Sequence, residues 1–292
     1  MRIFLAVSVS SGALIMAGCS NSAAASIHVD SDHHDRSNGV HQFDQDGDVS
    51  LLGSDMTIRG RIGGGLSVVG SDLDVSADIG EGMSLVGSDI SFDGSVGRDA
   101  SIAGSDVEWF GSAGGDVDIA GSDVEWSGSA VGNLSIAGSD VEVDGRIGGD
   151  LDVAGSDIDI ATDSRIAGDL SIAGSDLNVY GEMDGDADLV GISIDIEGRI
   201  EGRLIAIAYS RRGWSWSSDN SHQRVRINGA IGAGSAVCAR RVAIGRDAVL
   251  ANGLTVFADE APVFENGAPQ TGVTYAEING RDCDDLLEPY NR

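Results

Sequence analysis

The octapeptide IAGSDVEW decides the fold of this chain: it fills residues 102–109 and returns unchanged at residues 119–126. Its Gly-Ser-Asp core, or a close variant of it, recurs along most of the sequence. The spacing is 17 residues, with a single step of 19, and the glycines are Gly53, Gly70, Gly87, Gly104, Gly121, Gly138, Gly155, Gly174 and Gly191. A fixed period of this size indicates stacked repeats, and it is too short for helix-pair repeats, which need more than about 30 residues.

Each repeat has a regular apolar pattern when its residues are counted from the glycine as place 1. Places 4 and 6 are apolar and place 5 is polar, as in Val107 to Trp109, which is typical of a strand with one buried face. A single apolar residue at place 10, such as Ile147, marks a second face. Triplets such as Leu134-Ser135-Ile136 at places 14–16 mark a third. Glycines between the faces allow sharp corners.

The pattern predicts an all-β fold, a three-faced parallel β-helix (β-solenoid) with 17-residue coils. Each coil would bury its apolar edges by stacking on its neighbours. About a dozen coils at about 4.8 Å each would make a rod on the order of 60 Å long. Trp109 and Trp126 share one column and are expected to stack in the core. The two extra residues within 161–164 are expected to form a bulge at one corner.

The sequence predicts five segments along the chain. They are a lipoprotein signal peptide at residues 1–19, a flexible polar tether at 20–47, a regular acidic solenoid at 48–208, a protruding basic-aromatic loop at 209–224, and less regular coils with a C-terminal cap at 225–292.

The charge of the chain lies in its first two-thirds. The formal net charge is −29, and all 18 basic residues are arginines. Residues 1–197 hold 36 acidic residues and 7 arginines, whereas residues 198–292 hold 11 of each. Such a field repels nucleic acid and attracts cations or basic partners, so nucleic-acid binding is excluded. The 43 glycines with only 3 prolines indicate tight turns rather than collagen or a disordered polymer.

The first residues read as an export signal. Arg2 precedes a short apolar stretch that ends in Met16-Ala17-Gly18-Cys19, which resembles the lipobox of bacterial lipoproteins. That resemblance implies lipidation of Cys19, with the lipid holding the protein to a membrane. Ser20 next to it implies an outer-membrane lipoprotein that faces the periplasm or the cell surface. The alternative is ordinary signal cleavage near residues 23–25.

The remaining cysteines, Cys238 and Cys283, form an even pair in an exported chain. Oxidising compartments favour disulfides, so a bond between them is expected to tie the C-terminal tail to the body. Two separate buried thiols are the alternative.

A column of aspartates occupies place 3 of successive repeats, and stacked like charges need compensation. Either each carboxylate accepts backbone N–H bonds at its corner, or divalent cations such as Ca²⁺ lie between coils. At this column, calcium is the only cofactor that the sequence suggests. The column consists of Asp55, Asp72, Asp89, Asp106, Asp123, Asp140, Asp157 and Asp176.

Two polar segments carry weaker signals. The loop at 209–224 is either a lid over the solenoid or a contact for a partner, glycan or lipid interface. His33 and His34 in the tether could bind a transition metal loosely, although a flexible tether is the favoured interpretation. The contact residues proposed in the loop are Arg211, Arg212, Trp214 and Trp216.

No nucleophile elbow, metal-ligand triad or phosphate loop occurs in the sequence, and the chain is not expected to be an enzyme. His222 could imitate the loop histidine of hexapeptide acyltransferases, but no partner residue accompanies it. The short coils and the lack of lysine argue against polysaccharide lyases and hydrolases.

The motifs GRIGGDLDVAGSDIDI and GDLSIAGSDLNVYGEMDGDADLVGISIDIEGRIEGRL resemble the bactofilin-type, polymer-forming β-helix proteins. The resemblance covers roughly residues 48–208 and implies a right-handed helix and a scaffolding role. The export signal, the two extra cysteines, the loop and the acidic body depart from that family. The expected function is therefore a lipid-anchored envelope scaffold or spacer, able to self-associate. The alternative is a calcium-dependent surface adhesin or binding module that presents the loop.

Overall fold

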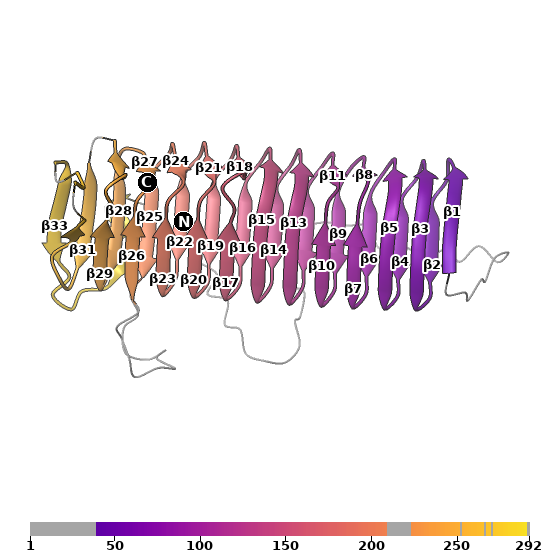
Figure 1. Cartoon of the computed structure of the whole chain (residues 1–292), viewed down its shortest axis with the longest axis horizontal. Coiled ribbons are helices and arrows are strands. Elements are labelled where there is room, and N and C mark those ends of the chain that lie inside the picture. The colour runs from indigo at the N-terminus through magenta and orange to yellow at the C-terminus, as the bar shows by residue number, and fades with distance from the viewer. Residues whose placement is uncertain (1–38, 209–222, 252, 266, 270, 291–292) are drawn as a thin grey trace. The chain divides into compact units, whose positions relative to one another are not determined.

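The computed structural model describes residues 39–208, 223–251, 253–265, 267–269 and 271–290. These residues belong to one compact unit, Arg36–Arg292, and they form the predicted β-solenoid (Figure 1). Two parallel sheets run along it, one of 20 strands and one of 13. The coils have three faces, because the larger sheet bends around a corner and supplies two of them. The fold class predicted from the repeat is confirmed.

Face one holds places 3–6 of each coil. Its strands are β1 (Gly39–Gln45), β3 (Asp55–Ile62), β5 (Asp72–Ile79), β7 (Asp89–Phe92), β10 (Asp106–Trp109), β13 (Asp123–Ala130), β15 (Asp140–Ile147), β17 (Asp157–Ile160), β20 (Asp176–Val179), β23 (Ser193–Ile196), β26 (Arg224–Ile227), β29 (Arg241–Ile244) and β32 (Val263–Phe264).

Face two holds places 9 and 10. It is formed by the ends of β1, β3, β5, β13 and β15, which continue around the corner, and by seven two-residue strands. These are β8 (Ser95–Val96), β11 (Ser112–Ala113), β18 (Arg165–Ile166), β21 (Glu182–Met183), β24 (Arg199–Ile200), β27 (Ala230–Ile231) and β30 (Val249–Leu250).

Face three, the 13-stranded sheet, holds places 14–17. Its strands are β2 (Val49–Leu52), β4 (Leu66–Val69), β6 (Met83–Val86), β9 (Ala100–Ala103), β12 (Val117–Ala120), β14 (Leu134–Ala137), β16 (Leu151–Ala154), β19 (Leu170–Ala173), β22 (Ala187–Val190), β25 (Leu204–Ala208), β28 (Ser235–Ala239), β31 (Leu254–Ala258) and β33 (Val273–Glu277).

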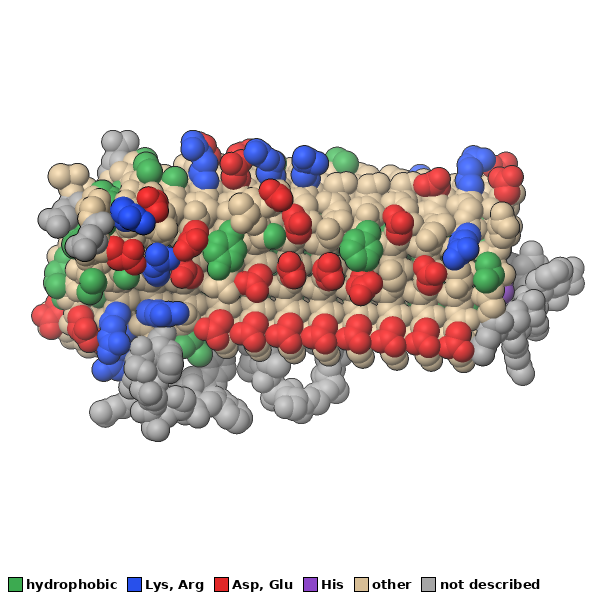
Figure 2. Space-filling model, in the orientation of Figure 1, with side chains coloured by type: hydrophobic (Ala, Val, Ile, Leu, Met, Phe, Trp, Pro, Cys, Tyr) green, Lys and Arg blue, Asp and Glu red, His purple; other side chains and the backbone are tan. Residues whose placement is uncertain are grey.

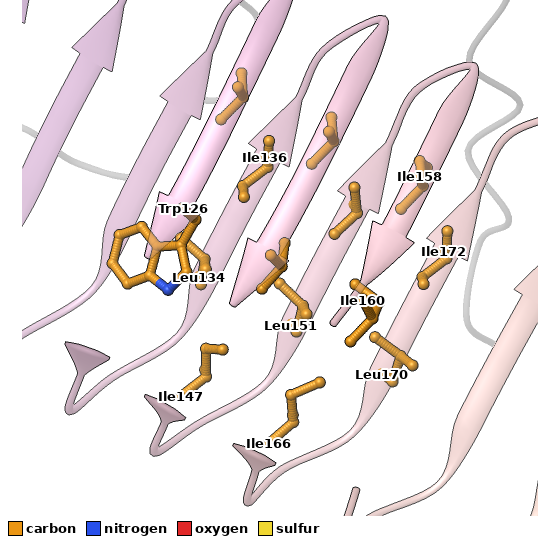
Figure 3. Packing of buried hydrophobic residues seen from close by; sticks show 14 of the residues in the cluster. Trp126, Leu134, Ile136, Ile147, Leu151, Ile158, Ile160, Ile166, Leu170 and Ile172 are labelled. Carbon is orange, nitrogen blue, oxygen red and sulfur yellow. The ribbon is translucent and has the colours of Figure 1, made fainter. Parts of the chain in front are cut away.

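Successive coils pair residue for residue, so each place of the repeat becomes a continuous column. β10 pairs with β13 so that Asp106 lies beside Asp123 and Trp109 beside Trp126. Places 4, 6, 10, 14 and 16 point inward and form one core along the solenoid (Figure 3). Because the columns are in register, the identity of a residue at one place decides which residue types it meets in both neighbouring coils.

The predicted aromatic stack is confirmed. The rings of Trp109 and Trp126 are fully buried, with centroids 5.0 Å apart and planes 12° from parallel. Phe92 extends the stack by one coil, at 4.5 Å from Trp109. The stack needs room beside it, and place 8 supplies that room: a Cβ on Gly128 would come 2.6 Å from Trp109 and 2.3 Å from the carbonyl oxygen of Gly111. Glycine at this place therefore permits the aromatic column.

The two inserted residues form a turn at the corner between faces one and two, as the sequence predicts. The turn lies between β17 and β18. Its last residue, Ser164, is fully buried, and its hydroxyl donates to the carbonyl oxygen of Val143 at 2.6 Å. The insertion is thus absorbed locally, and the columns regain their register in β18.

The solenoid begins earlier than the sequence predicts. β1 pairs with β3 along its whole length, whereas the sequence predicts a flexible tether up to residue 47. The triplet Gly-Ser-Asp is absent from this coil, and His41 and Gln45 occupy columns that hold isoleucine in the next coil. A first coil with polar residues at inward places escapes detection by apolar periodicity. The preceding part of the predicted tether lies outside the described residues.

The C-terminal segment covers the side of the solenoid. It contains α1 (Cys283–Leu287) and the 3₁₀ turn η2 (Glu288–Tyr290). Leu286 and Leu287 pack with Ile205 and Ala236, which point outward from face three. The hydroxyl of Tyr290 donates to Thr255 at 3.0 Å. The predicted cap therefore lies over the outer surface of β25, β28 and β31.

Candidate functional site

The aspartates at place 3 form an exposed row along the edge where face one begins, here called the Asp ladder. Its eight members open strands β3, β5, β7, β10, β13, β15, β17 and β20, and each lies beside the next in the pairing register. Figure 2 shows a straight row of acidic side chains along this side of the solenoid. The repeat therefore brings together all eight residues that the sequence singled out.

The ladder holds its carboxyl groups close enough to affect one another. Hydrogen bonds with Asp55 and Asp89 raise the pKa of Asp72, and burial and the neighbouring charges add to the effect. Partial desolvation is the main cause that raises the pKa of Asp106 and Asp140, followed by their ladder neighbours. These three carboxyl groups thus hold their protons more tightly, as expected for like charges in a row.

An open groove runs along the first part of the ladder. Asp55, Asp72, Asp89 and Asp106 line it together with polar side chains at place 5, such as Asp74 and Glu108. Within the part of the chain that the structure describes, no group of three or more His, Cys, Asp or Glu side chains is arranged to hold a metal ion. Calcium binding by the ladder stays a prediction.

A second column of carboxyl groups binds the backbone, and the sequence analysis missed it. At place 13, a side-chain oxygen accepts the N–H of the equivalent residue in the next coil: Asp150 accepts from Asp169 at 2.8 Å, and Asp169 from Asp186 at 2.9 Å. Asn133 does the same for Asp150 at 2.8 Å. The acceptors at this place are Asp48, Asp99, Asp116, Asn133, Asp150, Asp169 and Asp186, and the two coils between Asp48 and Asp99 have glycine there. Its signal was the recurrence of Asp or Asn at a second fixed place.

The backbone contacts expected of corner aspartates thus occur at place 13. The hydrogen bonds identified for Asp72 at place 3 join it to its ladder neighbours. The two columns differ in role because a place-13 oxygen points along the stack toward the next corner N–H, which it satisfies.

The charge along the ladder column reverses near the C-terminal end. After Asp176 the column continues as Ser193, Arg224 and Arg241. Arg224 donates to the Ser193 hydroxyl at 3.1 Å, and Arg241 pairs with Glu260 at 3.3 Å. Basic side chains follow the acidic row at this end in Figure 2.

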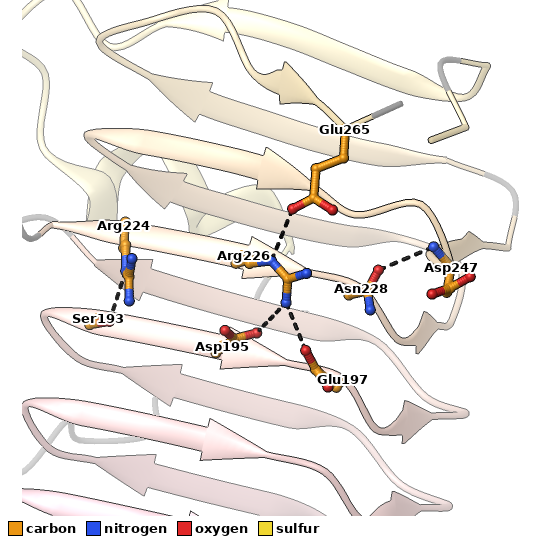
Figure 4. A network of polar contacts seen from close by, with 8 residues as sticks. All are labelled: Ser193, Asp195, Glu197, Arg224, Arg226, Asn228, Asp247 and Glu265. Atoms are coloured by element: carbon orange, nitrogen blue, oxygen red, sulfur yellow. Dashed lines mark hydrogen bonds and ion pairs between the residues drawn. The ribbon is translucent and has the colours of Figure 1, made fainter. Parts of the chain in front are cut away.

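Arg226 links three coils just beside this reversal (Figure 4). Its Nη1 lies 2.8 Å from Glu197 and 3.3 Å from Asp195, and its Nε lies 3.1 Å from Glu265. The hydrogen bonds to Glu265 and Glu197 raise the pKa of its guanidinium. Asp195 and Glu197 belong to the coil of β23, and Glu265 follows β32, so this cation ties the last regular coil to the irregular ones.

Cys238 and Cys283 are joined by a disulfide, the pairing that the cysteine count predicts. Cys238 points outward from β28 and Cys283 begins α1, and both are buried. The bond fixes the C-terminal segment to the side of face three.

Several predicted functional residues lie outside the described part of the chain. These are the lipidation residue and the tether histidines, together with the loop contacts and the loop histidine: Cys19, His33, His34, Arg211, Arg212, Trp214, Trp216 and His222. No helix among the described residues is both long and apolar enough to cross a bilayer.

Comparisons of the chain with protein-family models, with curated proteins and with solved structures found no match.

Proposed function

We propose that the protein is a non-enzymatic, lipid-anchored spacer or scaffold of the bacterial cell envelope. The observation that supports this most is the single unbroken core of in-register coils that runs along the solenoid. In a solenoid each coil contacts only its neighbours, so the number of coils sets the length of the body. Such a body is suited to holding other components apart or in line.

The anchor of this proposal is Cys19, which ends the lipobox-like residues 16–19. A disulfide between Cys238 and Cys283 fits an oxidising, extracytoplasmic compartment. We expect labelled palmitate to enter the parent protein and not a Cys19→Ser variant. A Ser20→Ala variant, which keeps the cysteine, is the control. Equal labelling of the parent and Cys19→Ser would reject lipidation at this residue.

Self-assembly of the scaffold would use the ends of the solenoid. Among the described strands, β1 and β2 pair on one side only, as do β32 and β33 at the other end. Unpaired strand edges are templates for further pairing. Sedimentation velocity in EDTA tests this: assemblies that keep growing with concentration support an end-to-end scaffold, whereas a size that does not grow supports a spacer.

The Asp ladder favours a second candidate, a calcium-dependent adhesin or binding module that presents the loop at 209–224. Carboxylates in register at each coil offer hard oxygen ligands of the kind Ca²⁺ takes. Titration calorimetry with Ca²⁺ separates the two functions. No heat at millimolar Ca²⁺ would remove the adhesin, and binding that Asp106→Asn and Asp123→Asn together abolish would favour it.

A further inference from the structure

The outer surface of face three carries a continuous apolar row at place 17, here called the apolar row. Leu52 is 72% exposed, and Val69, Val86 and Val190 are 45%, 44% and 40% exposed. Between them lie five alanines in the same pairing register. The full row is Leu52, Val69, Val86, Ala103, Ala120, Ala137, Ala154, Ala173 and Val190.

The molecule itself shows what covers this row. The same column continues through Ile207, Cys238 and Phe257, in β25, β28 and β31. There α1 and η2 lie over it: Cys283 bonds to Cys238, and the ring of Tyr290 meets Phe257 edge-on at 6.2 Å. The apolar row is therefore the exposed continuation of a surface that the chain covers at its C-terminal end.

The outward columns of face three carry fewer acidic residues than the edge of face one. Its other outward column, at place 15, is serine in the first four coils, from Ser50 to Ser101. Asp118, Asp152 and Asp188 then alternate with Ser135 and Ser171. In contrast, the edge of face one carries an aspartate in eight coils. A chain with a net charge of −29 would meet strong repulsion there.

An antiparallel pairing of two copies through face three matches both columns. A two-fold axis between Ala120 and the partner's Ala137 places Asp118 opposite the partner's Ser135. The same axis places Asp152 opposite the partner's Ser101 and Asp188 opposite the partner's Ser67. Every aspartate on this face thus meets a hydroxyl donor, and the alanines at the centre meet one another. Small side chains at both columns allow two sheets to lie close together.

The size of this surface suits a specific dimer. Under this axis the coil of Leu52 faces the partner's covered coil of Ile207, so the eight coils from Val69 to Val190 meet. Eight coils at about 4.8 Å and a four-residue strand at about 3.3 Å per residue give roughly 38 Å by 13 Å, or about 500 Å² per copy. The total of about 1,000 Å² reaches the roughly 1,000 Å² expected of a biological interface.

We infer that face three pairs with face three of a second copy, side by side and antiparallel, through the apolar row. This contact differs from the end-to-end growth considered above, because it stops at two copies. It places the two first coils at opposite ends of the pair.

The test uses the full chain in mild detergent, with its mass followed by light scattering from low to high micromolar concentration. We expect the parent to saturate at two copies. Ala137→Arg, which places a charge at the centre of the contact, should weaken pairing at least about tenfold, a loss of about 1.4 kcal/mol. Ser112→Arg, an equal change on the exposed side of face two, should pair as the parent does. Circular dichroism should show the same fold in all three.

A parent that stays a monomer at the highest concentration would overturn the inference, as would an Ala137→Arg variant that pairs normally. The relative orientation of the two copies is tested by oxidising a mixture of Val69→Cys and Val190→Cys chains. In the antiparallel pair these two residues face each other, so a disulfide should join one chain of each variant, and neither variant by itself should form a disulfide-linked dimer. A disulfide between Val69→Cys and Ser67→Cys chains instead would indicate parallel copies and reject the antiparallel arrangement. A mass that rises beyond two copies would indicate end-to-end assembly and would support the scaffold function proposed above, separately from this pairing.

Discussion

At the scale of single residues, the same amino acid has different roles at two places of the repeat. An aspartate at place 3 belongs to an exposed row of like charges, whereas Asp150 at place 13 accepts a backbone N–H from the next coil. Asn133 makes the same contact one coil earlier, so the contact needs an oxygen acceptor and no negative charge.

We expect Asp150→Ala to lower the free energy of unfolding by about 1 kcal/mol, because the N–H of Asp169 loses its acceptor. Asp150→Asn should leave stability nearly unchanged, since Asn133 shows that an amide oxygen fits this place. Urea denaturation of the three proteins measures the difference. Equal losses in the two variants would show that charge, and not the hydrogen bond, matters here.

The two stacked tryptophans differ in the hydrogen bonding of their indole N–H groups. Trp109 donates its indole N–H to the carbonyl oxygen of Gly111 at 2.9 Å, whereas the buried N–H of Trp126 has no acceptor among the described residues. Phe92 in the same column shows that a phenyl ring fits.

Trp109→Phe should therefore cost about 1 kcal/mol more than Trp126→Phe, because only the first change breaks a hydrogen bond. Both lose similar buried area, so the comparison cancels most of the packing loss. Thermal or urea unfolding of the pair provides the measurement. A larger loss in Trp126→Phe would mean that its N–H is satisfied in solution.

At the scale of elements, α1 depends on its attachment to face three. A helix of five residues is too short to be stable by itself in water. It is held by the disulfide, which closes a separation of 45 residues, and by the packing of Leu286 and Leu287 on β25 and β28.

Replacing both cysteines, Cys238→Ala with Cys283→Ala, should lower stability by about 2–4 kcal/mol. Hydrogen exchange should show that the backbone amides of α1 and β28 lose protection first. The amides of β5 to β15 should stay protected, because each coil of a solenoid contacts only its neighbours. A uniform loss of protection along the whole solenoid would contradict this and show that the coils unfold as one unit.

At the scale of the whole molecule, the acidic ladder makes stability depend on pH. The pKa values of Asp72, Asp106 and Asp140 are raised in the folded protein by their ladder neighbours and by desolvation. A group with a raised folded pKa contributes stability below its unfolded pKa, and that contribution is lost as the pH rises through the folded value. The ladder thus favours the folded state in mild acid and opposes it at neutral pH.

We expect the triple variant Asp72→Asn, Asp106→Asn, Asp140→Asn to be more stable than the parent at pH 7. Its advantage should shrink as the pH falls toward the carboxyl range. Urea midpoints at pH 7 and about pH 4.5 give the comparison. A triple change at exposed aspartates away from the ladder, Asp78→Asn, Asp93→Asn and Asp184→Asn, controls for net charge. A stability gain of equal size in the control would assign the effect to total charge.

The repeat determined the fold from the sequence alone. A period of 17 residues with apolar residues at fixed places predicts a stack of coils, because a single coil cannot bury its own apolar edges. The core columns, the aromatic pair, the ladder and the corner insertion follow from that pattern. Each depends on neighbours at a constant separation in the chain, so counting residues was enough to place them.

Tertiary structure decided the features that break or leave the repeat. β1 was missed because its inward places hold His41 and Gln45. Tertiary contacts also set the partner of each place-13 oxygen, the link from Arg226 to three carboxylates, and the position of α1 over face three. The contacts of Arg226 and α1 join residues whose separation in the sequence is irregular. The place-13 contacts recur regularly but depend on the direction in which a side chain points. Periodicity in the sequence gives neither kind of information. The apolar row recurs in the sequence, but its exposure, and the helix that covers its end, emerge only when the chain is folded.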